Sequence, residues 1–119
     1  MNYFFHPEAV DEHFSQVRYY EKQLPGLGKR YLAAFADAIE QACRDPKRFP
    51  IVCEPEIRRL RVRDFPYTVF FRERDGCIEV LAVAAHKRQP GYWLARAQPP
   101  TRILQQELAE YKVDLNQEA

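Results

Sequence analysis

The chain has 119 residues, of which 46% are hydrophobic and 29% charged, and its net charge is +1. This length suits one domain with one hydrophobic core, and the composition excludes disordered, collagen-like and membrane-embedded proteins. The first residues lack the basic leader and apolar run of a signal peptide, and no later stretch approaches the length of a membrane span. We therefore expect a cytoplasmic protein that makes no contact with a membrane.

The charges are unevenly distributed along the chain. Residues 44–98 carry 12 basic and 7 acidic side chains, whereas the parts on either side carry more acidic than basic ones. The three cysteines, Cys43, Cys53 and Cys77, are far apart and have no CxxC or Cys/His spacing. This arrangement indicates neither a disulfide framework nor a zinc site, and we expect no metal and no cofactor.

Two helices are predicted in the first third of the chain. Pro7 and Glu8 are typical of a first helical turn. Apolar residues then recur at helical spacing as far as the break at residues 24–26: Val10, Phe14, Val17 and Leu24. A second stripe runs up to the helix stop at Asp45 and Pro46: Leu27, Tyr31, Phe35, Ile39 and Ala42. Because the break is short, the two helices should form an antiparallel hairpin.

From Glu56 the apolar period changes to two. Leu60 and Val62 alternate with arginines at 59, 61 and 63, which predicts a strand with one buried and one basic face. Residues 67–71 are β-branched or aromatic, and residues 78–84 follow a hairpin signal at Asp75-Gly76. We predict an α+β domain in which the helical hairpin packs on a small antiparallel sheet, a three-stranded meander with residues 3–5 as a candidate edge strand.

A further amphipathic helix is predicted near the C-terminus. After the linker at residues 98–100, apolar residues recur at helical spacing: Leu104, Leu108, Tyr111 and Leu115. We assign residues 1–98 to the main body of the domain and residues 99–119 to a helical extension of it. The apolar stripe most simply packs on its own domain, and a contact in a homodimer or with a partner protein is the alternative.

The order of these elements, with several short segments placed on them, resembles the RelE/ParE family of bacterial toxins. The resemblance covers about residues 1–97 and rests on Ile57-Arg58-Arg59-Leu60, Phe65-Pro66-Tyr67, the segment from Val83 to Arg88, Tyr92-Trp93 and Arg96. It implies the toxin of a type II toxin-antitoxin system, which inhibits growth and is neutralised by a cognate antitoxin protein. RelE-like members cleave messenger RNA on the ribosome and ParE-like members block DNA gyrase, so the resemblance leaves the target open.

Metal-free RNA cleavage needs groups that transfer protons and cations that stabilise charge on the phosphate. His86 and Tyr92 are the candidates for proton transfer, since an imidazole with a pKa near ~6.5 exchanges protons at neutral pH. The candidates for binding phosphate, or an acidic partner, are Arg59, Arg61, Lys87, Arg88 and Arg96. RelE-like nucleases typically carry an arginine after an aromatic residue on the middle strand, but here Thr68 follows Tyr67.

Each candidate also has a simpler interpretation. His86 at a strand end can be a hydrogen-bonded structural residue, and the arginines can be a solvated face. Tyr92 and Trp93 can cover one end of the core instead of stacking on a base. At the level of the whole protein, the alternative is a non-toxic, repurposed member of the same fold that binds nucleic acid or another protein.

Overall fold

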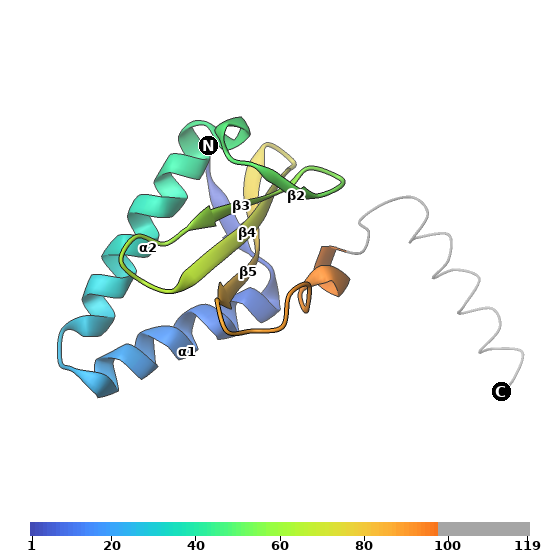
Figure 1. The fold of residues 1–119 in the computed structure, drawn as a ribbon. Helices are drawn as coiled ribbons and strands as arrows, with labels where there is room; N and C mark the ends of the chain where they lie inside the picture. The colour runs from blue at the N-terminus through green and yellow to red at the C-terminus, as the bar shows by residue number, and fades with distance from the viewer. Residues whose placement is uncertain (98–119) are drawn as a thin grey trace, which may run out of the picture.

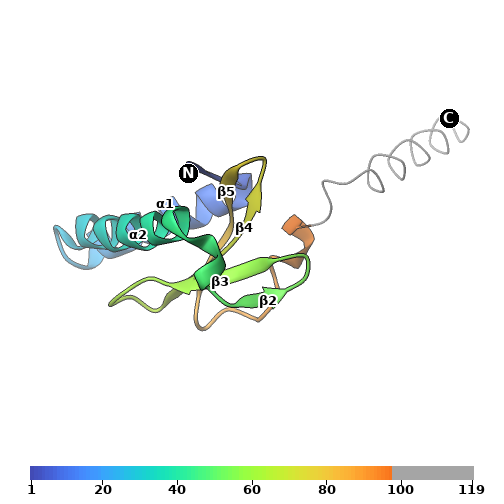
Figure 2. The same cartoon turned by 90° about the horizontal axis from the view of Figure 1, so that it is seen from above.

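The computed structural model describes residues 1–97, and the helix predicted within residues 99–119 lies outside them. The elements follow in the order β1 (Tyr3–Phe5), α1 (Pro7–Gln23), α2 (Leu27–Arg44), the 3-10 turn η1 (Pro46–Arg48), β2 (Ile51–Cys53), β3 (Ile57–Arg61), β4 (Tyr67–Arg74), β5 (Cys77–Ala85) and the 3-10 turn η2 (Leu94–Ala97) (Figure 1). Both helices lie on one side of the sheet, and residues 86–97, which we call the strap, lie on the other side (Figure 2).

The sheet has five strands in the order β1-β5-β4-β3-β2. The predicted meander of β3, β4 and β5 is confirmed, and so is the edge strand at residues 3–5. The prediction of an antiparallel sheet of three or four strands is wrong, because β1 runs parallel to β5 and β2 adds a fifth strand beside β3. β2 has only three residues, between Pro50 and the turn at residues 54–56, which is too short to show a period of two.

The helical hairpin is held by specific contacts at its ends. α1 begins at Pro7, where the Nδ1 atom of His6 accepts a hydrogen bond from the Glu8 amide. At the turn, the Glu21 carboxylate accepts hydrogen bonds from the amides of Gly26 and Gly28. A Cβ atom at Gly28 would lie 2.8 Å from the Glu21 Oε1 atom and 3.0 Å from the Val17 carbonyl oxygen, so this close approach requires glycine.

The buried face of α1 differs from the predicted one. Phe14 and Leu24 are 50% and 55% exposed, whereas Ala9 and His13 are buried. α1 approaches the sheet at Ala9, the small residue on its buried face. The ring of His13 packs among aromatic rings, with its centroid 4.4 Å from that of Phe35 and 5.2 Å from that of Phe5. The predicted stripe is wrong at Phe14 and Leu24, whereas Val17 does pack against the core under the helices. Hydrophobicity alone misplaced the stripe because a small residue and a polar aromatic one form much of the contact surface.

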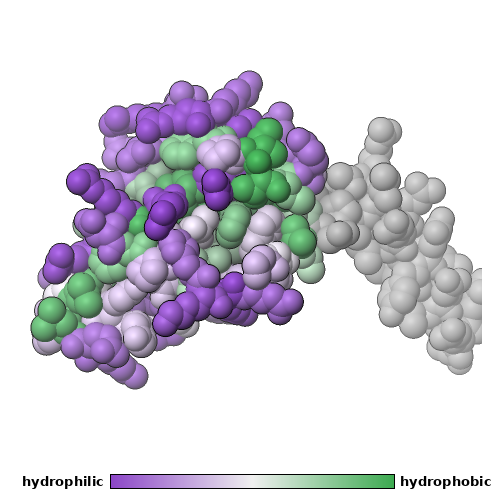
Figure 3. Space-filling model, in the orientation of Figure 1, coloured by the Kyte–Doolittle hydropathy of each residue, from purple (hydrophilic) through white to green (hydrophobic). Residues whose placement is uncertain are grey.

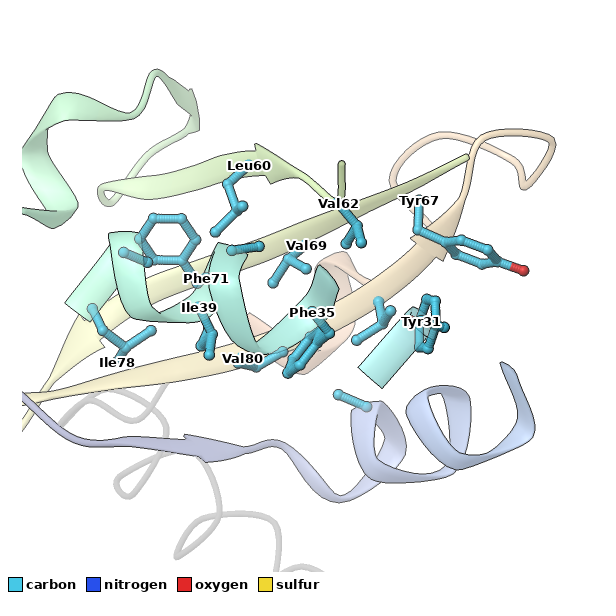
Figure 4. Packing of buried hydrophobic residues seen from close by; sticks show 14 residues of the cluster. Tyr31, Phe35, Ile39, Leu60, Val62, Tyr67, Val69, Phe71, Ile78 and Val80 are labelled. Atoms are coloured by element: carbon cyan, nitrogen blue, oxygen red, sulfur yellow. The ribbon is translucent and has the colours of Figure 1, made fainter. Parts of the chain in front are cut away.

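α2 buries the face that its sequence predicts. Tyr31, Phe35, Ile39 and Ala42 are all at most 4% exposed. They pack against apolar residues of β3, β4 and β5 and against Val62, which directly follows β3. The strand residues are chiefly Leu60, Val69, Phe71, Ile78 and Val80 (Figure 4). This cluster is the main core, and it lies between the hairpin and the sheet.

A second, smaller cluster lies on the opposite face of the sheet. Phe70 of β4 stacks on Trp93 of the strap, with ring centroids 4.5 Å apart and planes inclined by 24°. Trp93 is 4% exposed, which agrees with the interpretation that it covers part of the core. The same face buries an ion pair between Arg72 and Glu79 (2.7 Å), and Arg72 also donates a hydrogen bond to the carbonyl oxygen of Ala97. The strap is therefore fastened to this face at its far end.

Candidate functional site

The exposed arginines of β3 lie on the face of the sheet that the helices leave open. Arg59 is paired with Phe70 of β4, and Arg61 is paired with Thr68. Arg58 points to the other face, where it donates hydrogen bonds to two carbonyl oxygens beside η1, at 2.7 and 3.3 Å. Within residues 1–97 neither Arg59 nor Arg61 has an ion-pair partner. Arg59 and Arg61 are thus available to a partner of opposite charge, whereas Arg58 stabilises the fold.

His86 follows directly after β5 and lies beside Thr68. Its Nε2 atom is 3.1 Å from the Thr68 hydroxyl oxygen, and its backbone amide donates a hydrogen bond to the Pro66 carbonyl oxygen at 3.0 Å. The side chain is exposed, and with Arg61 it lines a shallow hollow beside the turn between β3 and β4. The predicted imidazole and one predicted arginine therefore border the same space.

The strap brings the remaining predicted residues to a single carboxylate, that of Glu12 on α1. The Tyr92 hydroxyl donates to the Glu12 Oε2 atom at 2.5 Å, and two Arg96 nitrogens lie 2.7 and 3.1 Å from the two carboxylate oxygens. Arg88 lies 3.9 Å from the same carboxylate, and its guanidinium carbon is 4.0 Å from the centre of the Tyr92 ring. We call the side chains of Glu12, Arg88, Tyr92 and Arg96 the Glu12 clamp.

The Glu12 clamp joins three parts of the fold. Besides its contacts with the strap, Glu12 accepts a hydrogen bond from the Val83 amide in β5 at 3.1 Å. Arg96 also binds the Glu8 carboxylate at 2.9 Å and donates to the Leu81 carbonyl oxygen at 3.1 Å. Because helix, sheet and strap all contribute, the clamp sets the position of the strap across the sheet.

The clamp changes the acid-base behaviour of Tyr92 and Arg96. Burial, together with the hydrogen bond to Glu12, raises the pKa of the Tyr92 hydroxyl above its ordinary value. Burial alone would lower the pKa of Arg96, but the hydrogen bonds and charge of Glu12 outweigh that effect and raise it. At neutral pH Tyr92 is therefore a protonated hydrogen-bond donor, and Arg96 is a fixed cation.

Lys87, by contrast, has an exposed side chain in the turn after β5 and makes no ion pair within the described part of the chain. The predicted basic residues thus divide into two groups. Arg96 is 10% exposed and holds the strap, whereas Arg59, Arg61 and Lys87 face solvent. Arg88 belongs to both groups, because its side chain remains 56% exposed while it stacks on Tyr92.

An apolar groove runs between β2 and the strap on this face. It encloses about 470 Å³, and its walls are Val52, Cys53, Phe70, Ala84, Trp93 and Leu94. Thr68, His86 and Arg88 form its polar rim. The groove places apolar surface next to exposed cations, a combination that suits an amphipathic acidic segment better than a small polar substrate.

Glu12, which fastens the strap, is absent from the residues predicted from the sequence. Its partners at residues 88, 92 and 96 are far away in sequence, so no local pattern connects them. One signal was present: Ala9, His13 and Gln16 mark a buried face with few apolar residues, and Glu12 lies on that same face.

Comparison with known protein families identifies residues 3–90 as a match to the family model described as the ParE toxin of the type II toxin-antitoxin system parDE. The chain belongs to the ParE toxin family. The expectation of a RelE/ParE-type toxin is confirmed, and the protein is the toxin component of a type II toxin-antitoxin system. ParE toxins pair with a cognate antitoxin. No curated protein matches the chain.

The ParE match ends at residue 90, before the last part of the strap. Tyr92, Trp93 and Arg96 therefore lie beyond the matched range, although they are the residues that fasten the strap to α1 and to the sheet. Arg59, Arg61, His86, Lys87 and Arg88 lie within it. No helix in the described residues is long and apolar enough to cross a membrane, and among them no three His, Cys, Asp or Glu side chains gather as a metal site would require.

Proposed function

We propose that this ParE toxin arrests growth by binding DNA gyrase through Arg59, Arg61, Lys87 and Arg88, and that it does not cleave RNA. The observation that carries the proposal is the hydrogen bond that the Tyr92 hydroxyl donates to the Glu12 carboxylate at 2.5 Å. A general acid in RNA cleavage must deliver its proton to the leaving oxygen. The proton of Tyr92 is directed to a carboxylate of the same chain instead.

The pKa of Tyr92 and the contacts of His86 also support binding over cleavage. Efficient proton transfer requires a pKa near the working pH, and burial together with Glu12 moves the pKa of Tyr92 away from neutrality. His86 has the Thr68 hydroxyl at 3.1 Å, where a guanidinium would be needed to stabilise a phosphorane-like charge. The pair is suited to hydrogen bonding and poorly suited to phosphate chemistry.

The exposed cations favour an extended acidic partner surface. Arg59 and Arg61 are two residues apart on one strand, Arg88 lies at the rim of the groove, and the exposed Lys87 precedes it in the turn after β5. Rows of this kind accelerate encounter and select partners by charge, with modest dependence on the precise fit of each contact. An acidic protein surface, or the DNA held by gyrase, would meet this requirement.

The test is induced expression of the full chain in a bacterial host, combined with a supercoiling assay on purified gyrase. The double variant Arg59→Glu/Arg61→Glu should lose growth arrest and gyrase inhibition by at least about tenfold, because like charges then face the acidic partner. His86→Gln and Tyr92→Phe should each retain growth arrest to within about threefold, the range of a single lost hydrogen bond.

The matched control is Arg18→Glu/Arg30→Glu, which makes the same change in charge at exposed positions on the helices. It should inhibit gyrase as well as the unaltered chain does. Transcript cleavage that disappears in His86→Gln while gyrase remains active would overturn the proposal in favour of a ribosome-dependent nuclease. A folded chain that neither arrests growth nor inhibits gyrase would instead favour the repurposed, non-toxic alternative.

A further inference from the structure

Large apolar side chains are exposed in the walls of the groove between β2 and the strap. Val52 on β2 is 42% exposed and Leu94 on the strap is 44% exposed, and Ile51 beside Val52 is 43% exposed. Figure 3 shows hydrophobic surface over β2 and again beside η2. The arginines proposed to bind gyrase do not account for this apolar surface. Exposed apolar surface bordered by polar residues is typical of a contact between proteins.

The charges around the groove determine which kind of surface fits it. No carboxylate is among the described residues that line it, and Arg88 lies on its rim. Arg59 lies next to it, because that residue is paired with Phe70, which lines the groove. Arg88 is 3.9 Å from Glu12, but this carboxylate is already bound by Arg96 at 2.7 Å, and the Arg88 side chain remains 56% exposed. The groove therefore suits an apolar segment that carries negative charge of its own.

The aromatic rings of the groove favour a protein partner over a nucleic acid. Proteins that bind single-stranded nucleic acid stack its bases on exposed aromatic faces. Here Trp93 is 4% exposed and stacks on Phe70, with ring centroids 4.5 Å apart. The Tyr92 ring contacts the guanidinium groups of Arg88 and Arg96, whose central carbons lie 4.0 and 5.1 Å from the ring centre. The large side chains that remain most exposed in the groove are aliphatic, and aliphatic surface packs against the apolar side chains of another protein.

We propose that the groove holds aliphatic side chains of a gyrase segment whose carboxylates pair with Arg59 and Arg88. This inference rests on the proposed function and adds a second kind of contact to it. The arginines attract gyrase to this face of the toxin, and the groove retains it there. Exposed charges mainly change the rate of association, whereas most other contacts in an interface change the rate of dissociation. The groove and the arginines therefore differ in a rate that can be measured.

Surface plasmon resonance of the full chain on immobilised, purified gyrase separates the two contributions. Leu94→Asn, which keeps nearly the same shape and adds no charge, should raise the rate of dissociation about tenfold and change the rate of association less than about threefold. Arg59→Glu/Arg61→Glu should mainly slow association, and its effect should shrink as salt is added. The matched control is Leu24→Asn, the same change at a residue that is 55% exposed at the turn of the helical hairpin. It should alter each rate less than about twofold.

Cys53, which lines the groove, gives a second measurement that leaves Leu94 and the arginines unchanged. In the full chain with Cys43→Ser and Cys77→Ser it is the single thiol, so its reaction with a soluble maleimide, followed by mass spectrometry of the toxin, reports access to the groove. Gyrase at about ten times its dissociation constant should slow this reaction about tenfold, because the groove is then occupied about 90% of the time. A chain that retains only Cys77, at the start of β5 and outside the groove, should react at an unchanged rate.

Inhibition of gyrase by a chain whose Cys53 stays fully accessible, with an unchanged dissociation rate in Leu94→Asn, would refute the role of the groove and leave the proposed function standing. A folded toxin that does not inhibit gyrase would overturn both. Two further results would assign the groove to another occupant and also overturn the inference. Protection of Cys53 by DNA alone would assign the groove to nucleic acid. Protection that increases with toxin concentration alone, from about 1 to 100 μM, would assign it to a second copy of this chain.

Discussion

The two faces of the sheet are closed by different kinds of interaction, and neighbouring residues of β4 show the contrast. Phe71 points into the main core under the helices and is fully buried, whereas Phe70 points to the opposite face, where it meets Trp93. The first face is sealed by apolar packing of α2. The second is covered by a single crossing segment, which charged groups hold in place at Glu12 and Arg72.

Within this small domain, one face of the sheet therefore provides most of the stability, and the other face provides the surface for recognition. Apolar packing on the helix side is non-directional and excludes water, so it suits a permanent core. Ion pairs and hydrogen bonds on the strap side fix a geometry while leaving arginines and apolar surface exposed. The face that is closed least completely is therefore the one on which we expect partners to bind.

The largest expected effect is on the helix side. Phe71→Ala should lower the free energy of unfolding by about 3–5 kcal/mol, because it leaves a cavity in a fully packed cluster. Phe70→Ala should cost less, since that ring is partly exposed and has one stacking partner. Urea denaturation of both variants measures the difference. Equal losses would mean that the strap side contributes as much to stability as the main core.

A smaller effect is expected from the Glu12 clamp. Glu12→Gln should lower the free energy of unfolding by about 2–3 kcal/mol, because it removes the charge that Arg96 and Tyr92 share in a largely buried site. The matched control, Glu40→Gln, breaks an exposed pair with Arg44 and should cost less than about 0.5 kcal/mol.

The clamp prediction has a local readout as well. Hydrogen exchange at the amides of residues 92–97 should accelerate in Glu12→Gln more than exchange at the amides of β4, because the strap is released before the sheet opens. Exchange that accelerates uniformly over the domain would contradict a role for Glu12 in holding the strap.

The smallest effect is expected from pH and arises at His13. Burial lowers the pKa of His13 below its ordinary value of 6.5, and its Nδ1 atom has no hydrogen-bond partner among the residues that the structure describes. Below pH 6.5 the unfolded chain binds a proton that the folded chain excludes, so stability should fall as the pH falls and level off below the folded pKa. Well above pH 6.5 His13 is neutral in both the folded and the unfolded chain, so it contributes nothing to the pH dependence of stability.

Urea denaturation at pH values from about 5 to 8 measures this slope. His13→Leu should reduce it, because that variant lacks the buried imidazole. A slope that persists in His13→Leu would place the titrating group elsewhere, most simply on the strap side of the molecule.

Much of the fold could be predicted from the sequence because its signals are local. α2 and β3 show clear periods of 3.6 and 2, and the turn signal at Asp75-Gly76 separates β4 from β5. β2 was missed because three residues are too few to show a period. The parallel pairing of β1 was missed because strand direction depends on the path of the whole chain, which no local pattern reports.

The candidate site was predicted less completely for the same reason. Arg59 and Arg61 could be placed on one face from their spacing alone, and the structure has them there. The role of Arg96 in the strap depends on Glu12, which is 84 residues away in sequence. The sequence suggested that Arg96 is a cation that binds a separate molecule. The folded structure shows that its ion-pair partner, Glu12, lies within the same chain.

The pairing of β1 with β5 also bears on how the protein folds. Tyr3 lies beside Ile78 and Phe5 beside Val80, so β1 joins the sheet only through residues that are far away along the chain. The helical hairpin can form early from local contacts, but this edge of the sheet requires a long-range pairing. We expect the sheet, and with it the row of arginines on β3, to become ordered later in folding than the helical hairpin.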